Sequence, residues 1–292
     1  MFDLKLLILQ MVTGVALGSV FVLLSIGLSL IFGMLTVVNF AHGAYFMVGA
    51  YVGVYALGVT GNFWLSLVIV PLAVGALGLL TERFLVRPLY GRGIDYPLLL
   101  TFGLSYVMMD LVRMVFGSDG QPIGTPPGLG GAVDIGVGNF PVYRLFLIVA
   151  TAIIVAALWL FIEKTRFGLI IRAGARDPEI VRVLGIDVSK AWLLVFGLGT
   201  AIAGLSGILA APIRAVTPEM GIPVLIEAFV VTVVGGMGSL PGAIVAGLLV
   251  GIVYSLSSLY VPDFADTSIF VLMALVLLVR PQGLFGRAGL MS

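Results

Sequence analysis

Long uncharged segments dominate the chain, and the helices are predicted from them. Residues 6–81 contain no Asp, Glu, Lys or Arg, and as a helix rising about 1.5 Å per residue they would extend over roughly 110 Å. Because a bilayer's hydrocarbon core is about 30 Å thick, this stretch is expected to cross a membrane about three times. Turns are predicted near Asn39–Gly43 and Gly58–Asn62, where Asn and Gly interrupt the apolar pattern.

The rest of the chain predicts further membrane spans in the same way. An uncharged run from Ala228 to Pro262 is interrupted at Gly235–Gly242, so we expect a short segment over 222–235 and a full span after the break. The total is eight or nine, depending on whether the short segment crosses completely. The fold class is therefore an all-α integral membrane bundle with some broken helices. The remaining spans are expected at 96–117, 141–162, 191–213 and 264–279.

Composition agrees with a membrane protein and excludes several other classes. Of the 292 residues, 61% are apolar and 10% charged, against about 45–50% and about 25% in soluble domains. A net charge of +1 argues against a nucleic-acid partner. With one His and no Cys, we expect no metal site, no cofactor and no catalytic residue. The chain is expected to form one transmembrane domain over residues 1–292.

Basic residues concentrate in three polar segments, and this predicts the orientation. The segments 118–140 and 257–266 carry Asp and no base, so the positive-inside rule places them outside and the basic segments in the cytoplasm. The number of spans between the acidic and the basic segments is consistent with this orientation if the segment 222–235 crosses the membrane. The cytoplasmic bases would be Arg83, Arg87, Arg92, Lys164, Arg166, Arg172, Arg176, Arg182, Lys190, Arg280 and Arg287.

The polar segment 163–190 contains a predicted short helix. Asp177 is placed to cap it and Pro178 to occupy its first turn. Ile180, Val181, Val183 and Leu184 would give it an apolar face, and Gly185 is a typical terminator. Two interpretations stay open: a connector held on anionic lipid by its bases, or a docking helix for a cytoplasmic partner.

Two breaks between spans contain polar or glycine residues at membrane depth. Asn39 and His42 either line a pathway at a hinge, with Gly33 and Gly43 permitting a bend, or cap free backbone groups; the capping interpretation is favoured for His42. Segments 36–55 and 232–254 share an apolar–break–glycine-rich layout, which hints at an internal repeat.

Other charged and small residues in the spans have simpler interpretations. Glu227 is either an intramembrane carboxylate or a solvated vestibule residue. Asp110 and Arg113 are expected to neutralise each other at helical i,i+3 spacing. Gly247 and Gly251 have the spacing of close helix packing.

Four stretches together resemble the branched-chain amino acid permease family of ABC importers (LivH/LivM type, nearer to LivH). They are RAGARDPEIVRVLGID at 172–187, VNFAHG at 38–43 with MVGAY at 47–51, VGGMGSLPGA at 234–243 and RPQGLFG at 280–286. Many relatives have Lys in the triplet that reads Glu227-Ala228-Phe229 here, and this reversal of charge leaves the solute open.

The resemblance implies a non-enzymatic permease subunit in a bacterial or archaeal plasma (inner) membrane, with the loop and C-terminus cytoplasmic. Its implied partners are two cytoplasmic ABC ATPases, a second permease subunit (LivM-like or a second copy), an external or periplasmic solute-binding protein and membrane lipid. The alternatives are a same-family permease for urea, an amide or an aromatic acid, an ion-coupled carrier, or an intramembrane enzyme built around His42 with Asp110 or Glu227. The implied coupling residues are Arg172, Ala175, Asp177, Glu179, Leu184 and Gly185, and the implied pathway residues are Asn39, His42, Gly43, Glu227, Gly236, Gly238 and Ser239.

Overall fold

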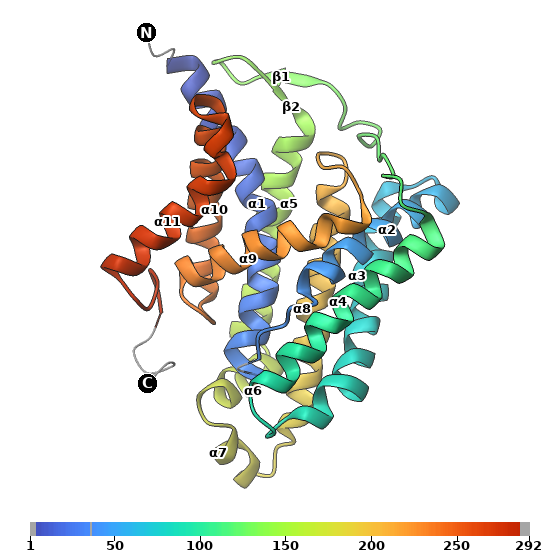
Figure 1. The fold of residues 1–292 in the computed structure, drawn as a ribbon, viewed down its shortest axis with the longest axis vertical. Coiled ribbons are helices and arrows are strands. Elements are labelled where there is room, and N and C mark those ends of the chain that lie inside the picture. The colour runs from blue at the N-terminus through green and yellow to red at the C-terminus, as the bar shows by residue number, and fades with distance from the viewer. Residues whose placement is uncertain (1–3, 36, 287–292) are drawn as a thin grey trace. The chain divides into compact units, whose positions relative to one another are not determined.

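A computed structural model describes residues 4–35 and 37–286, so Thr36 of the repeat hint and Arg287 of the basic tail lie outside it. Within the described residues, nine helical stretches are long and apolar enough to cross a membrane. The all-α membrane fold is therefore confirmed. The helices are α1 (Leu4–Leu35), α2 (His42–Thr60), α3 (Phe63–Thr81), α4 (Asp95–Phe116), α5 (Val142–Lys164), α6 (Arg166–Arg176), α7 (Pro178–Val183), α8 (Val188–Ala210), α9 (Gly221–Gly235), α10 (Leu240–Tyr260) and α11 (Ala265–Val279) (Figure 1).

Each predicted span coincides with an observed helix to within a few residues. The short segment before the second break is α9, and with the preceding 3-10 turn Pro218–Met220 it reaches the length of a span. Two regions of the chain differ from the expectation. The chain after α3 continues as a π-helical turn Glu82–Val86 and a 3-10 turn Arg87–Leu89, and α6 occupies much of the 163–190 loop.

The chain divides into two compact units, and the first comprises residues 1–26, 124–154 and 226–292. In it α1 packs on α10 through glycines: a Cβ added to Gly14 would lie 2.6 Å from the Ile252 Cα, and Gly251 lies against Gly18. Small residues at such crossings let two backbones approach closely. The close packing predicted from Gly247 and Gly251 is thus confirmed.

An apolar cluster and a small hairpin complete the first unit. The cluster joins α1, α9, α10 and α11 through buried side chains that include Phe21, Val231, Val250 and Ile269. The hairpin pairs β1 (Ala132–Asp134) with β2 (Asn139–Pro141) in antiparallel register, and Phe140 of β2 is buried. A hairpin within the segment 118–140 was not expected from the sequence, because strands of three residues carry too little alternation to detect.

The second unit comprises residues 27–123 and 155–225, and α8 packs there against both α2 and α3. Gly204 of α8 lies against Gly49 of α2, and Thr200 of α8 occupies the space beside Gly78 of α3. The rings of Tyr45 on α2 and Phe196 on α8 meet edge to face at 6.3 Å between centroids. Side chains and backbones therefore interlock along these three helices, with no room for added atoms at the crossings.

Candidate translocation pathway and coupling site

The break between α1 and α2 is built around Asn39, whose side chain is fully buried. Its Oδ1 accepts a hydrogen bond from the Ala41 backbone N–H at 3.1 Å, and its carbonyl accepts one from the His42 N–H at 3.1 Å. The Phe40 N–H donates to Thr101 Oγ1 on α4 at 3.1 Å. Asn39 therefore supports the first turn of α2, as a capping residue would.

His42 and Gly43 begin α2 in a closely packed environment. His42 is fully buried, and a Cβ on Gly27 of α1 would lie 3.1 Å from its Cε1. Gly43 crosses the first residue of α9 so closely that a Cβ would overlap the Gly221 carbonyl and lie 2.8 Å from the Leu225 Cβ. The role of Gly33 and Gly43 in permitting a bend stays a prediction. Helix α1 runs on through Gly33, and Gly43, which does not have positive φ, provides a close helix crossing.

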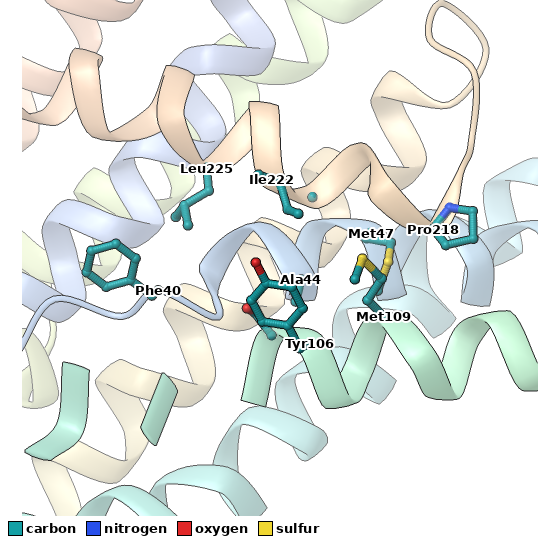
Figure 2. A pocket seen from close by; sticks show the side chains of 10 residues that line it. Phe40, Ala44, Met47, Tyr106, Met109, Pro218, Ile222 and Leu225 are labelled. Carbon is teal, nitrogen blue, oxygen red and sulfur yellow. The ribbon is translucent and has the colours of Figure 1, made fainter. Parts of the chain in front are cut away.

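A pocket of about 30 Å³ lies beside this break (Figure 2). By volume it holds about one or two water molecules. In Figure 2, Tyr106 and Met109 extend from α4 toward α2, while Ile222 and Leu225 come from α9. The lining is predominantly apolar, with the Ser105 and Tyr106 hydroxyls as its polar groups: Phe40, Ala44, Met47, Ser105, Tyr106, Met109, Pro218, Gly221, Ile222 and Leu225.

One turn beyond Met109, an ion-pair cluster holds the chain that leads into α9 against α4. The guanidinium of Arg113 donates to Glu219 Oε1 from Nε at 3.1 Å and from Nη2 at 2.6 Å, and to Asp110 Oδ1 from Nη1 at 3.0 Å. The predicted Asp110–Arg113 pair is confirmed. Sequence reasoning missed Glu219, since it is 106 positions from Arg113 and no local spacing connects the two.

The second break, between α9 and α10, contains Gly236, Gly238 and Ser239. Both glycines have positive φ (100° and 79°), a conformation in which L side chains are strained. Ser239 caps α10, because its Oγ accepts from the Gly242 N–H at 3.1 Å. Gly236 and Gly238 therefore form the turn that follows α9, and Ser239 is the N-cap of α10. The pathway role of the three residues stays a prediction.

The C-terminal tail closes over this second break. The Leu284 N–H donates to the Val234 carbonyl at 2.8 Å, and the Phe285 N–H donates to the Gly235 carbonyl at 3.0 Å. The last carbonyls of a helix have no partner within it, and here the tail supplies two of the donors. Two of the stretches singled out from the sequence, VGGMGSLPGA and RPQGLFG, therefore form one structural feature.

Glu227 lies in the second turn of α9 and is half-buried, with its Oε2 shielded from solvent. Next to it Ala228 is fully buried, and the Ala228 carbonyl accepts a hydrogen bond from Ser25 Oγ at 3.4 Å. The carboxylate is thus enclosed in part by protein.

The segment 163–190 forms α6 and α7, and the predicted boundaries of the short helix are confirmed. Asp177 Oδ1 accepts from the Glu179 and Ile180 N–H groups at 3.0 Å each, and Gly185 ends the helix with φ 78°. The four apolar residues differ in exposure: Val181 is buried, whereas Val183 and Leu184 are 86% and 71% exposed.

The remaining coupling residues divide between structural and exposed positions. Arg172 of α6 forms an ion pair with Glu163 at 2.8 Å and donates to the Ile162 carbonyl, which holds α6 against the end of α5. Ala175, Glu179, Leu184 and Gly185 are exposed. Val183 and Leu184 thus form an exposed apolar end of this capped helix, and the coupling role of these residues stays a prediction.

Several known proteins that this chain resembles are named branched-chain amino acid transport permeases. Residues 10–280 match the family described as "Branched-chain amino acid transport system / permease component". The permease LivH of Salmonella typhimurium is 32% identical, with 95% of each chain covered, and BraD of Pseudomonas aeruginosa is 31% identical over the same shares. LivM of Escherichia coli is 26% identical, covering 91% of this chain and 67% of LivM. No solved structure matches significantly.

Proposed function

The chain belongs to the branched-chain amino acid transport permease family, and from this premise we propose that it is the membrane-spanning permease subunit of an ABC importer for branched-chain or related amino acids. The observation that carries the proposal is the family match, which runs over residues 10–280 and includes both breaks and the segment 163–190. The relatives LivH and BraD are named high-affinity branched-chain amino acid transport permeases.

Energy for transport would come from two cytoplasmic ABC ATPases that dock on α6 and α7. The chain has no G-x-x-x-x-G-K-[ST] phosphate-binding motif, so we assign ATP hydrolysis to these partners. The exposed Val183 and Leu184 supply apolar contact area for docking. ATP binding would draw the docked helices together and shift the equilibrium between outward- and inward-open states. The bases near the segment 163–190 and the tail favour a cytoplasmic location for both.

The solute would pass beside the break at Asn39–Gly43, in a pathway completed by a second permease, LivM-like or a second copy. The pocket beside the break supports this, because its apolar lining suits an aliphatic side chain. Its volume of about 30 Å³ is too small for a whole amino acid. Met47 and Met109, whose side chains are flexible, would therefore have to move aside. An external binding protein would deliver the solute.

One residue supports a second candidate solute within the same family. Glu227 places a partly enclosed carboxylate in α9, at a position where the family resemblance implies Lys. A reversed charge changes the electrostatic preference of a solute pathway. A related small solute, such as urea, an amide or an aromatic acid, is therefore the alternative cargo.

The decisive experiment is reconstitution of the chain with two ABC ATPases, a second permease and a solute-binding protein from the same organism. We expect ATP-dependent uptake of radiolabelled leucine into proteoliposomes, and competition by urea, amides and aromatic acids distinguishes the alternative cargo. ATP-independent uptake by the chain alone would contradict the proposal and favour a carrier.

A pair of substitutions on α4 tests the pathway. Met109→Trp fills the pocket, where Met109 is 8% exposed, and is expected to abolish uptake while the complex still assembles. Leu111→Trp is the matched control, because Leu111 is 54% exposed on the same helix and lies outside this pocket. Equal uptake by the two variants would refute a pathway through the pocket.

A further inference from the structure

A buried carboxylate lies at the end of α3, outside the pathway and the docking helix. Glu82 begins the π-helical turn, and its side chain is 0% exposed. Arg87 donates to Glu82 from Nε at 3.1 Å and 3.2 Å and from Nη2 at 2.8 Å, and the Tyr90 hydroxyl donates to Oε1 at 3.1 Å. Both carboxylate oxygens therefore have charged or polar donors, which a buried charge requires.

The same guanidinium connects this cluster to α8. Arg87 Nη2 also donates to the Ser189 carbonyl, at 3.2 Å, in the first turn of α8. One side chain thus bridges the end of α3 and the beginning of α8. A π-helical turn inside a helix often marks a functional position, and here it sets Glu82 at this bridge.

Aromatic contacts continue the cluster to the docking helix. The Tyr90 ring meets the Trp192 ring of α8 edge to face, with centroids 4.9 Å apart. The Arg182 guanidinium of α7 lies 5.4 Å from the centroid of the same Trp192 ring, within the range of a cation–π interaction. Burial, followed by the neighbouring Glu82 carboxylate, raises the pKa of Tyr90, so its phenol keeps the proton that it donates.

Beyond the cluster, α8 packs tightly against both α3 and α2. Gly78 of α3 accommodates Thr200 of α8, and Gly204 of α8 lies against Gly49 of α2. Because these crossings have no free space, a displacement of the first turn of α8 is transmitted to α2 and so to the break at Asn39–Gly43.

We propose that Glu82, Arg87, Tyr90, Trp192 and Arg182 form a junction that transmits movement of the docking helix α7 to α3 and α8, and through α8 to the pathway helix α2. The five are positioning residues for transport and have no contact with the solute. The inference rests on the proposed function, since movement of α7 has meaning only if an ATPase docks there.

The test uses the complete transporter with Glu82→Gln, which keeps the shape of the side chain and removes its charge. We expect the complex to assemble and hydrolyse ATP, while the solute transported per ATP falls about tenfold, within the usual range of coupling between sites. Arg92→Lys is the control, because Arg92 is exposed on the same segment after the π-helical turn; it should leave this ratio unchanged.

A second variant keeps the proposal testable if Glu82→Gln does not fold. Tyr90→Phe deletes one hydrogen bond and keeps the ring against Trp192, and it is expected to lower the same ratio by a smaller factor. The junction would be overturned if each variant that folds transports as much solute per ATP as the wild type. Any fall in uptake would then be matched by an equal fall in ATP hydrolysis and in the amount of assembled complex. A wild-type complex without ATP-driven uptake would instead contradict the proposed function.

Discussion

Replacing the cap of the docking helix gives a sharp test of how α7 works. Asp177→Ala removes the oxygen that accepts the Glu179 and Ile180 N–H groups, both at 3.0 Å. Helix α7 has six residues, and a helix this short does not form in water without such support. The substitution therefore leaves the fold of the spans intact and loosens the helix that carries the exposed Val183 and Leu184.

The size of the effect follows from the strength of an N-cap. Loss of a capping side chain costs about 1 kcal/mol, which is roughly a fivefold change in an equilibrium constant at 25 °C. If the ATPase binds only the formed helix, its apparent affinity falls by the same factor at most, about fivefold. Uptake at limiting ATPase concentration is expected to fall in proportion.

The assay is titration of the partner ATPase onto the permease in nanodiscs. Asp177→Asn is the matched control, because Asn is as good a cap as Asp but has no charge. We expect Asn to bind like the wild type and Ala to bind more weakly. If Asn and Ala weaken binding equally, the carboxylate contacts the ATPase directly and the capping argument is refuted.

The remaining predictions concern glycines and are read from thermal unfolding in detergent. Gly251→Ala is expected to cost about 1–3 kcal/mol, because its Cβ would overlap the Gly18 backbone of α1. Gly103→Ala is its control: it lies in α4 with open space around its Cβ position, and we expect an unchanged or slightly raised melting temperature. Gly283→Ala should destabilise by about 1–2 kcal/mol, because φ is 78° and a Cβ would lie 2.5 Å from the Val233 carbonyl; a melting temperature equal to wild type would show that the tail does not stabilise the α9–α10 break.

Much of the fold could be predicted because a membrane span is recognised from the hydrophobicity of consecutive residues alone. An apolar run long enough to span a bilayer must be a helix, so the predominantly apolar stretches located the nine candidate spans of the described residues to within a few residues. Capping is equally local: Asp177 accepts hydrogen bonds from residues two and three positions ahead, and Gly185 ends the same helix. The ends of α7 were therefore predictable from residues that are close together in the sequence.

The candidate sites were predicted only in part. Asn39 was a candidate because a polar residue in an apolar run is conspicuous, whereas Met109 and Leu225 look like any lipid-facing residue until the pocket places them together. Glu82 was overlooked because it adjoins the bases Arg83 and Arg87 and looked like part of a solvated loop. Its complete burial depends on Tyr90 and on the beginning of α8.

The membrane class, the positions of the helices, the two breaks and the capped helix within the segment 163–190 follow from the amino-acid pattern alone. These depend on hydrophobicity and on hydrogen bonds between neighbours, which a linear pattern records. Packing in three dimensions is needed to show that the C-terminal tail closes the α9–α10 break, that Arg113 pairs with Glu219, and that Arg87 links Glu82 at the end of α3 to α8. Such contacts join residues many positions apart, and their energy arises from burial and geometry that exist only once the helices have packed.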